Sequence, residues 1–395
     1  MTDKNCLFVL VGDVSADKHV AKLVGHLKEL QPQLQVFGIG GPEMLKAGVE
    51  LMYNCHDFSE IGIVKLVRKI PKWIQIRKQL LAKIEEKKPG CALLVDFGGF
   101  NIGFTSSIRK NFKNLPIVYF ISPQVWGSRP WRLNELARNV SKMLVIFPFE
   151  QPIYERKGIP ARFVGHPLMA KPEIWDQKYS REEFMGKIGL NPEKPMVAVF
   201  PGSRAQEITD LFPVIAQAIK WMQRVRPEIQ FVLSQQSERI AELIAKQIEK
   251  HDLKTGPDKG FVLVEPDENY KLLSIADLVW AKSGTTTLET TLCGTPMIVF
   301  YRGDWLSYLL VLCFKIVKRV AWPNLLAGRE LVPELIQLDC RAEKLVEYTL
   351  DMMDVPALRH EIAGELRTLR DQLGQGDFTK NAALEILEII GCRTA

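Results

Sequence analysis

The second half of the chain contains the stretch that decides the fold, residues 196–225, which read MVAVFPGSRAQEITDLFPVIAQAIKWMQRV. Its first five residues, Met196–Phe200, are all apolar, which is typical of a strand covered on both faces of its sheet. A turn with a glycine and then an amphipathic segment, Leu211–Val225, follow directly. A buried strand, a turn and a helix in this order are the repeating unit of a parallel α/β sheet.

The same unit recurs on both sides of this stretch. Amphipathic segments such as Lys18–Leu30, Trp73–Lys87 and Arg239–Lys250 separate short apolar runs. The runs predict a first series of strands at Cys6–Val11, Gln35–Gly38, Ala92–Asp96, Pro116–Phe120 and Lys142–Ile146, and a second series at Met196–Phe200, Gln230–Leu233, Phe261–Val264, Leu278–Ala281 and Met297–Phe300. We therefore expect an α/β protein with two doubly wound, Rossmann-like parallel-sheet domains, which face a cleft lined by strand-to-helix loops.

The break between the two series sets the domain boundaries. Gly165–Trp175 contains glycine and proline residues, which interrupt regular structure and suit a linker. A length of 395 residues accommodates two domains of roughly 150–200 residues each. We predict a first domain over residues 1–168, a second over 169–365 and a helical C-terminal tail over 366–395, which includes Asn381–Ile390.

Charge and cysteine usage narrow the class of protein only coarsely. The net charge of +6 suits phosphate-bearing substrates or an anionic membrane face without selecting either. The seven cysteines are scattered, so we expect no metal site and a reducing compartment. The N-terminus lacks the pattern of a signal peptide, and no stretch of about 20 apolar residues occurs. These features predict a cytoplasmic protein, with attachment to a membrane surface left open.

The loop after Met196–Phe200 combines Gly202, Ser203 and Arg204 just before a helix. Glycine lets the backbone approach an anion, serine donates a hydrogen bond, and arginine supplies a fixed positive fork. The helix start adds backbone N–H donors. The loop therefore suits a diphosphate, with a plain turn and a solvated arginine as the alternative.

A second loop of this kind, Ser283, Gly284 and Thr285, precedes a helix that carries Glu289. Small hydroxyl residues at a helix start can cap it and hold phosphate oxygens. Thr285 and Glu289 share a helix face, where a carboxylate can accept hydrogen bonds from ribose hydroxyls. A capped helix with a surface glutamate is an equal alternative locally, but two such loops in one domain favour a nucleotide site.

The first domain places acids at the ends of two predicted strands. Asp13 and Asp17 follow the first strand, and Asp96 ends the strand at Ala92–Asp96 beside two glycines. A carboxylate at a strand end suits a general base whose pKa is tuned by burial. The alternatives are an N-cap for Asp17 and a structural turn for Asp96.

Two further features suggest contacts with an acceptor and a membrane. Arg129, close behind Trp126, suits an acceptor phosphate, although solvated arginines are commoner. The stretches 61–76 and 306–320 are apolar and edged with Lys and Arg, which suits an anionic membrane surface. Core packing with basic edges is the alternative for both stretches.

In their order along nearly the whole chain, these residues resemble the lipid-A-disaccharide synthase family, a member of the GT-B class of glycosyltransferases. The matching motifs are Gly12–Asp17, Gly40–Pro42 with Met44, Ile61–Val64, Asp96 with Phe100 and Asn101, Ser122–Trp126, Gly165–Pro167, Pro201–Arg204, Ser283–Thr285 with Glu289, Tyr301 with Arg302, and Asn324–Glu330. The last motif and the order of all of them are the most specific features. Pro-Gly-Ser-Arg alone recurs in other sugar-nucleotide enzymes.

The resemblance implies an inverting glycosyltransferase that needs no metal or cofactor and works at the inner face of the cytoplasmic membrane. UDP-2,3-diacylglucosamine would donate its sugar to 2,3-diacylglucosamine 1-phosphate, giving the β-1,6-linked lipid A disaccharide precursor and UDP. The resemblance is also compatible with a homodimer that exchanges C-terminal segments. We therefore expect the tail to cross to the first domain or to a partner, and we expect no nucleic acid.

The resemblance also assigns roles to individual residues. Catalysis is expected of Asp96, Asp13 and Asp17. Donor and UDP binding is expected of Gly202, Ser203, Arg204, Ser283, Gly284, Thr285, Glu289, Arg302, Asn324, Arg329 and Glu330. Acceptor binding is expected of Ser15, Asn101, Gln124, Trp126 and Arg129, and membrane contact of Ile63, Val64, Leu66, Val67 and Trp73.

The chain departs from the family pattern on the acceptor side. Asp13 and Ala16 stand where members usually have Glu and Gly, Gly99 stands where many have a second acid, and Ser128 replaces an aromatic residue. These departures affect acceptor identity and rate more than donor binding. A non-catalytic UDP-sugar- or lipid-binding paralogue and a UDP-N-acetylglucosamine 2-epimerase-like enzyme are therefore alternative predictions.

Overall fold

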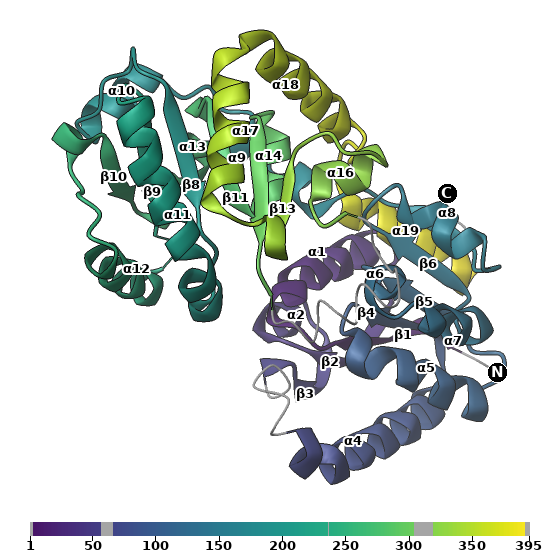
Figure 1. The fold of residues 1–395 in the computed structure, drawn as a ribbon. Coiled ribbons are helices and arrows are strands. Elements are labelled where there is room, and N and C mark those ends of the chain that lie inside the picture. Colours follow the sequence, from purple (N-terminus) through teal and green to yellow (C-terminus); the bar gives the residue numbers. More distant parts are fainter. Residues whose placement is uncertain (1–2, 57–65, 236, 304–318, 392–395) are drawn as a thin grey trace. The chain divides into compact units, whose positions relative to one another are not determined.

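The computed structural model of the chain describes residues 3–56, 66–235, 237–303 and 319–391 (Figure 1). The chain divides into two compact units. Unit 1 comprises Met1–Ala170 and Leu373–Ala395, and unit 2 comprises Lys171–Gln372. The predicted α/β fold of two doubly wound parallel-sheet domains with a helical C-terminal segment is confirmed.

Unit 1 is built on a seven-stranded sheet in the order β3-β2-β1-β4-β5-β6-β7, in which every pair of neighbours is parallel. Its strands are β1 (Asp3–Val11), β2 (Gln35–Gly40), β3 (Glu50–Asn54), β4 (Pro89–Val95), β5 (Ile117–Phe120), β6 (Lys142–Val145) and β7 (Ala161–Phe163). Its helices are α1 (Val14–Leu30), α2 (Pro42–Lys46), α4 (Leu66–Lys87), α5 (Gly98–Asn111), α6 (Val125–Ser128), α7 (Leu133–Asn139), α8 (Glu150–Glu155) and α19 (Phe378–Ile390).

Alternate side chains of β1 enter two different cores, because successive residues of a strand point to opposite faces. Phe8 and Leu10 pack with residues of α4, α5 and α7. Leu7 and Val9 pack with residues of α1 and α19. Helices therefore cover both faces of the sheet, which explains why β1 has no polar residue between Cys6 and Val11.

The C-terminal helix α19, drawn in yellow in Figure 1, packs against α1 and β4 of unit 1. Its N-cap residue, Asp377, accepts hydrogen bonds from the backbone N–H of Thr379 at 3.0 Å and pairs with Lys22 of α1 at 2.9 Å. Asn381 donates to the Val164 carbonyl at 3.0 Å. Helix α18 continues to Asp371, and the chain returns to unit 1 at Leu373.

Unit 2 contains a six-stranded parallel sheet in the order β10-β9-β8-β11-β12-β13. Its strands are β8 (Met196–Phe200), β9 (Gln230–Ser234), β10 (Phe261–Val264), β11 (Leu278–Lys282), β12 (Met297–Tyr301) and β13 (Glu334–Ile336). Its helices are α9 (Pro172–Trp175), α10 (Arg181–Lys187), α11 (Ala205–Val225), α12 (Glu238–Lys250), α13 (Asn269–Ile275), α14 (Thr285–Cys293), α16 (Trp322–Ala327), α17 (Ala342–Asp354) and α18 (Pro356–Asp371).

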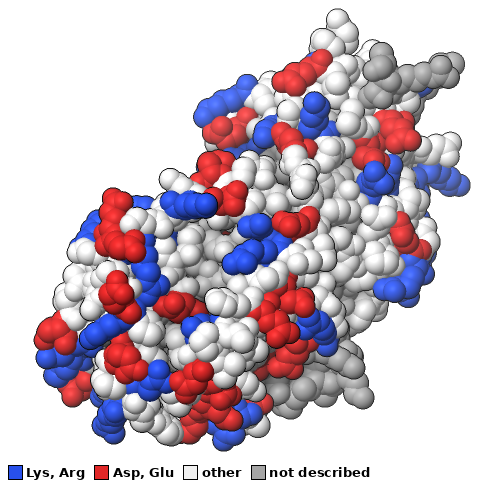
Figure 2. Space-filling model, turned by 90° about the horizontal axis from the view of Figure 1, so that it is seen from above, with Lys and Arg blue, Asp and Glu red and all other residues white. Residues whose placement is uncertain are grey.

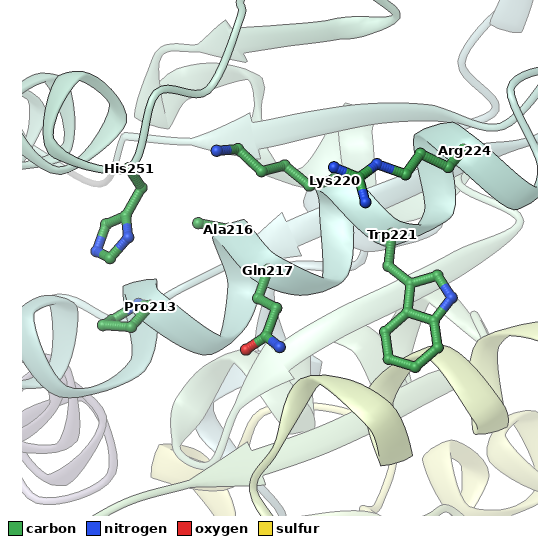
Figure 3. A pocket seen from close by; sticks show the side chains of 7 residues that line it. All are labelled: Pro213, Ala216, Gln217, Lys220, Trp221, Arg224 and His251. Atoms are coloured by element: carbon green, nitrogen blue, oxygen red, sulfur yellow. The ribbon is translucent and has the colours of Figure 1, made fainter.

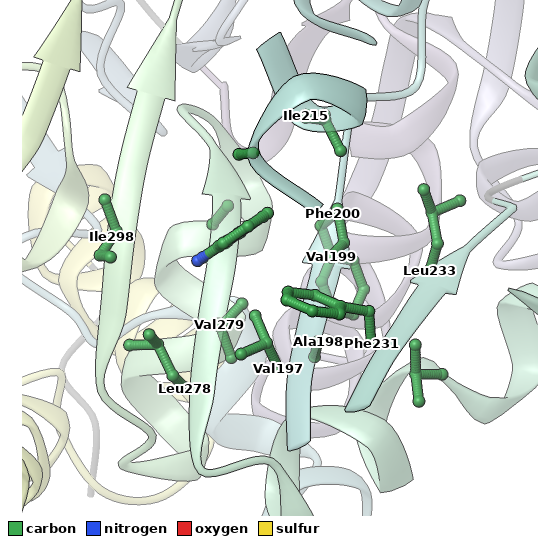
Figure 4. Packing of buried hydrophobic residues seen from close by; sticks show 14 of the residues in the cluster. Val197, Ala198, Val199, Phe200, Ile215, Phe231, Leu233, Leu278, Val279 and Ile298 are labelled. Atoms are coloured by element: carbon green, nitrogen blue, oxygen red, sulfur yellow. The ribbon is translucent and has the colours of Figure 1, made fainter. Parts of the chain in front are cut away.

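The core of unit 2 forms around the central strands β8, β9 and β11 (Figure 4). Val197, Phe231 and Val279 are fully buried there. Trp280 is also fully buried, and its indole N–H donates to the Thr349 hydroxyl at 2.9 Å. Such complete burial of neighbouring strands fixes the sheet and positions the loops at its carboxyl edge.

The surface is charged in a mixed pattern, and Figure 2 shows basic and acidic side chains interspersed over the face in view. Within the described part of the chain, we find no helix with the length and apolar character needed to cross a membrane.

Candidate functional site

Asp96 follows β4 in a backbone conformation that the fold must enforce. Asp96 and Phe97 have φ angles of +42° and +43°, in the left-handed region that side chains disfavour by about 1–3 kcal/mol each. Two side chains hold this turn by hydrogen-bonding the carbonyl of Asp96: the Asn101 amide at 3.0 Å and the Tyr119 hydroxyl. The strained turn is therefore clamped from two neighbouring elements, α5 and β5.

The carboxylates of Asp96 and Asp13 lie close enough to affect each other. Burial raises the pKa of Asp96 from its ordinary 3.8 to about 6, and the negative charge of Asp13 adds to this rise. Asp13 is exposed and caps α1 by accepting a hydrogen bond from the backbone N–H of Ser15 at 3.2 Å. Gly12 makes room for the Phe97 ring next to this turn, because a Cβ on residue 12 would lie 2.2 Å from that ring.

Asp96→Asn should stabilise unit 1 at neutral and alkaline pH. A carboxyl group whose pKa is higher in the folded than in the unfolded chain destabilises the fold as it ionises. The penalty is absent below the ordinary pKa of 3.8, grows up to about 6, and is complete above it. Urea unfolding at about pH 8 should therefore show a gain from Asp96→Asn that is lost at about pH 4. An equal change at both pH values would contradict the raised pKa.

Asp17, predicted to be catalytic, is held by backbone N–H groups of a neighbouring helix. Its side chain is 2% exposed, and its two oxygens accept hydrogen bonds from the backbone N–H groups of Gly41 at 2.8 Å, Glu43 at 2.9 Å and Met44 at 3.1 Å. These groups start α2, which has no cap of its own. Asp17 therefore caps α2 from α1, and its catalytic role stays a prediction.

The residues predicted to bind the acceptor differ in their exposure to solvent. Ser15, Gln124 and Arg129 are exposed. Asn101, however, is fully buried, and its amide donates to the carbonyls of Val95 and Asp96 at 3.0 Å. Asn101 therefore holds the turn that carries Asp96, and its role in acceptor binding stays a prediction.

Trp126 is half-buried and tied to a residue that sequence reasoning missed. The Glu150 carboxylate, at the start of α8, accepts hydrogen bonds from the Trp126 indole at 3.0 Å and from the Ser122 hydroxyl at 2.8 Å. Burial raises the pKa of Glu150 to about 7. Glu150 therefore anchors the Ser122–Trp126 segment, and its position after β6 is the one sequence feature that could have drawn attention to it.

The predicted membrane-contacting residues are only partly described. Ile63 and Val64 lie outside the described residues. Leu66 and Val67 belong to the first turn of α4, and their side chains are likewise not described. Trp73 packs inside unit 1, with its ring centroid 4.9 Å from that of Phe100 and 6.0 Å from that of Phe97.

In unit 2, the loop after β8 closes over the side chain of Glu207. Gly202 has a φ angle of +116°, and a Cβ there would lie 2.7 Å from the Glu207 carboxylate. The same carboxylate accepts hydrogen bonds from the backbone N–H groups of Ser203 at 3.1 Å and Arg204 at 3.3 Å. The Arg204 side chain is 83% exposed and so is available to a ligand.

The loop after β11 has a similar form at the start of α14. Gly284 has a φ angle of +154°, and its carbonyl accepts a hydrogen bond from the Thr287 hydroxyl at 2.9 Å. The Ser283 hydroxyl donates to the Val320 carbonyl at 2.9 Å, whereas Thr285 is exposed. Glu289, half-buried on α14, accepts from the Tyr270 hydroxyl at 3.1 Å, and burial raises the pKa of Glu289.

A pocket of about 860 Å³ opens beside the first of these loops. Its lining includes Arg204, Glu207, Tyr301 and Arg302, and the Arg302 guanidinium also donates to the Cys340 carbonyl. The structure thus places two predicted donor residues, Arg204 and Arg302, on one pocket of unit 2.

A smaller pocket of about 460 Å³ lies along α11 (Figure 3). It is lined by Pro213, Ala216, Gln217, Lys220, Trp221, Arg224 and His251. None of these residues belongs to the predicted site, and the strand ends of the sheet do not contribute to its lining.

Three predicted donor residues lie in α16 or shortly after it, and their surroundings differ. Asn324 is fully buried: its amide donates to the Val332 carbonyl at 2.8 Å, and its oxygen accepts from the N–H groups of Leu331 and Val332. These hydrogen bonds shape its own loop, and its role in donor binding stays a prediction. Arg329 pairs with Glu365 at 2.9 Å, and Glu330 is exposed.

The arrangement of each unit is shared with solved sugar-nucleotide enzymes. The structure of UDP-GlcNAc 2-epimerase from Neisseria meningitidis bound to UDP-GlcNAc matches with a TM-score of 0.61 and 13% sequence identity, over 97% of this chain and 100% of that one. At this identity the similarity concerns the fold alone. Two parallel sheets with anion-friendly loops at their strand ends define the class: the protein has a GT-B-like fold.

Sequence comparisons identify the family within that class. The family model for lipid-A-disaccharide synthetase matches residues 7–372. The lipid-A-disaccharide synthase of Geobacter sulfurreducens is 34% identical over 391 residues, covering 98% of this chain and 97% of the relative, and that of Syntrophus aciditrophicus is 34% identical over 384 residues, covering 97% of each. The chain belongs to the lipid-A-disaccharide synthase family, and it is a glycosyltransferase of lipid A synthesis.

Proposed function

We propose that this chain moves 2,3-diacylglucosamine from its UDP donor to 2,3-diacylglucosamine 1-phosphate. The reaction forms the β-1,6-linked lipid A disaccharide precursor and releases UDP. The acceptor 6-hydroxyl attacks the anomeric carbon and displaces the diphosphate, so that the configuration at this carbon inverts. No metal or redox cofactor takes part in this proposal.

The observation that carries the proposal is the position of Asp96. Its carboxylate follows a central strand, in a clamped turn, with a pKa raised by burial to about 6. A carboxylate with such a pKa is ionised at neutral pH yet basic enough to accept the proton of an attacking hydroxyl. Asp96 is accordingly the general base, and Asp13 modulates its basicity.

Unit 2 supplies the donor side of the proposal. Arg204 and Arg302 both line one pocket, and the loops at Gly202 and Gly284 lead into the starts of α11 and α14. Fixed positive charges and helix N-termini stabilise the negative charge that develops on a departing diphosphate. Glu289 is then placed to accept hydrogen bonds from the ribose.

Because both substrates are acylated, we place the reaction at a membrane surface. Diacylated sugars partition into bilayers, so we propose peripheral attachment at the inner face of the inner membrane. The basic and apolar stretches 61–76 and 306–320 are the segments that suit such contact. A homodimer that uses the C-terminal segment is part of the same proposal.

Two alternatives give different reactions. An epimerase would change the sugar of UDP-N-acetylglucosamine without any acceptor. A non-catalytic paralogue would bind UDP-sugar and form no product. Family membership favours the transferase over both.

The test is incubation of the purified chain with UDP-2,3-diacylglucosamine and 2,3-diacylglucosamine 1-phosphate. We expect disaccharide and UDP in equal amounts, with a product anomer opposite to that of the donor and no loss of rate in EDTA. UDP binding without product would leave the binding paralogue standing. Conversion of UDP-N-acetylglucosamine without an acceptor would favour the epimerase.

A further inference from the structure

Lys282 is the last residue of β11 and lies between the two anion-friendly loops of unit 2. Its ammonium nitrogen is 2.7 Å from a carboxylate oxygen of Glu207, which holds the loop after β8. The same nitrogen would lie 3.6 Å from a Cβ built on Gly284, in the loop after β11. Lys282 therefore reaches both loops from a strand that is itself fixed in the core.

The Lys282 side chain is held in place on two sides. It is 17% exposed, and the ring centroid of Tyr301 lies 5.6 Å from its ammonium nitrogen. An ammonium carries three N–H donors, and Glu207 takes one of them. Tyr301 and Glu207 also line the 860 Å³ pocket, so the ammonium group lies next to two residues that a ligand there would touch.

Glu207 by itself would oppose the binding of an anion. Burial alone would raise its pKa, but the hydrogen bonds from Lys282 and from the backbone N–H groups of Ser203 and Arg204 lower it, so that the group stays ionised. The described lining of the pocket carries two cations, Arg204 and Arg302, against two anions, Glu207 and Asp210. A favourable field for a diphosphate therefore depends on one further positive charge.

We propose that Lys282 is a binding residue for the diphosphate of the UDP donor, kept between the two loops by Glu207. This inference rests on the proposed function, because it assigns a ligand to the same unit. The ammonium group is then attracted more strongly by the two phosphates of a diphosphate than by the one phosphate of a monophosphate. Lys282 makes unit 2 select a nucleoside diphosphate over a monophosphate.

The experiment is isothermal titration of the full chain with UDP, UMP and uridine. Lys282→Met should weaken UDP binding by about 10- to 100-fold, since a hydrogen bond to a charged group contributes about 1.5–3 kcal/mol. It should weaken UMP binding clearly less and leave uridine binding unchanged. Lys187→Met is the matched control, because Lys187 also pairs with a poorly exposed glutamate, Glu268, at 2.6 Å in the same unit. It should leave all three affinities unchanged.

A double variant separates direct binding from neutralisation of Glu207. If Lys282 contacts the diphosphate, the double variant Lys282→Met with Glu207→Gln should also lose part of the preference for UDP over UMP. The ratio of its two affinities should be about tenfold smaller than in the wild type. Recovery of the wild-type preference would overturn the proposal, and so would an unchanged preference in Lys282→Met alone. Thermal unfolding of each variant serves as the control for folding. Lys282→Arg keeps a positive charge and should keep most of the preference for UDP over UMP. A wild-type chain that binds no UDP would overturn the proposed function itself, and this assignment with it.

Discussion

Asp96→Asn should lower kcat/KM for disaccharide formation by at least ~100-fold. The substitution keeps the size of the side chain and the turn held by Asn101 and Tyr119, but it removes the only group of this turn that can accept a proton. The affinity for UDP should not change, because the donor loops belong to unit 2. Product formation by the folded variant at the wild-type rate would remove Asp96 from the mechanism.

The pH dependence of the wild-type chain gives the same residue a second test. Because the base must be ionised, kcat/KM should fall as the pH drops below about 6, the value to which burial raises the pKa of Asp96. Asp13→Asn is the matched control: it removes the charge that adds to this rise, so its acidic limb should move to lower pH. A limb that stays in place in Asp13→Asn would show that the two carboxylates do not interact.

The sequence was sufficient for the fold wherever a strand is buried on both faces. Met196–Phe200 is such a strand, and its predicted bounds are those observed for β8. The strands that sequence reasoning missed are the outer strands β3, β7 and β13, each of which has at most three consecutive apolar residues. β7 has three residues, of which Arg162 is exposed, because an edge strand needs to bury less.

In the candidate site, sequence reasoning finds contacts between residues that are close along the chain and misses contacts between residues that are far apart along it. Strand-end positions pointed to Asp96 and Arg204, whose catalytic and binding roles stay predictions. Glu207 lies only three residues after Arg204, at the spacing of a helix-capping glutamate, so the sequence contained enough to find it. Glu150 contacts Ser122 across 28 residues of sequence, and only the folded sheet brings the two together.

Asp17 shows why an acid at a strand end is not sufficient evidence for catalysis. Its side chain was predicted from the same pattern as Asp96, yet the folded chain directs it to the start of α2. Gly41 allows this contact, since a Cβ there would lie 2.4 Å from the Asp17 carboxylate. Asp17 lies in the first turn of α1 and Asp96 directly follows β4, and tertiary packing decides what each carboxylate contacts.

Asp17→Ala should lower the free energy of unfolding by about 3 kcal/mol or more. Three backbone N–H groups, of Gly41, Glu43 and Met44, would lose their acceptor, and those of Gly41 and Met44 are buried. Asp17→Asn should also destabilise, because an amide nitrogen would then face an N–H donor. Urea unfolding measures both losses, and Glu43→Ala, which alters a partly exposed side chain of α2 and removes only its surface ion pair with Lys46, should change the free energy little.

The rates of the same variants distinguish a structural role of Asp17, the capping of α2, from a catalytic role. When rates are corrected for the folded fraction, Asp17→Ala should retain kcat/KM within about tenfold of the wild type, far from the loss expected for Asp96→Asn. A loss of ~100-fold in a variant that unfolds like the wild type would instead return Asp17 to the reaction. The expected pairing, a large loss of stability with a small loss of rate, follows from an oxygen pair that already accepts three backbone hydrogen bonds.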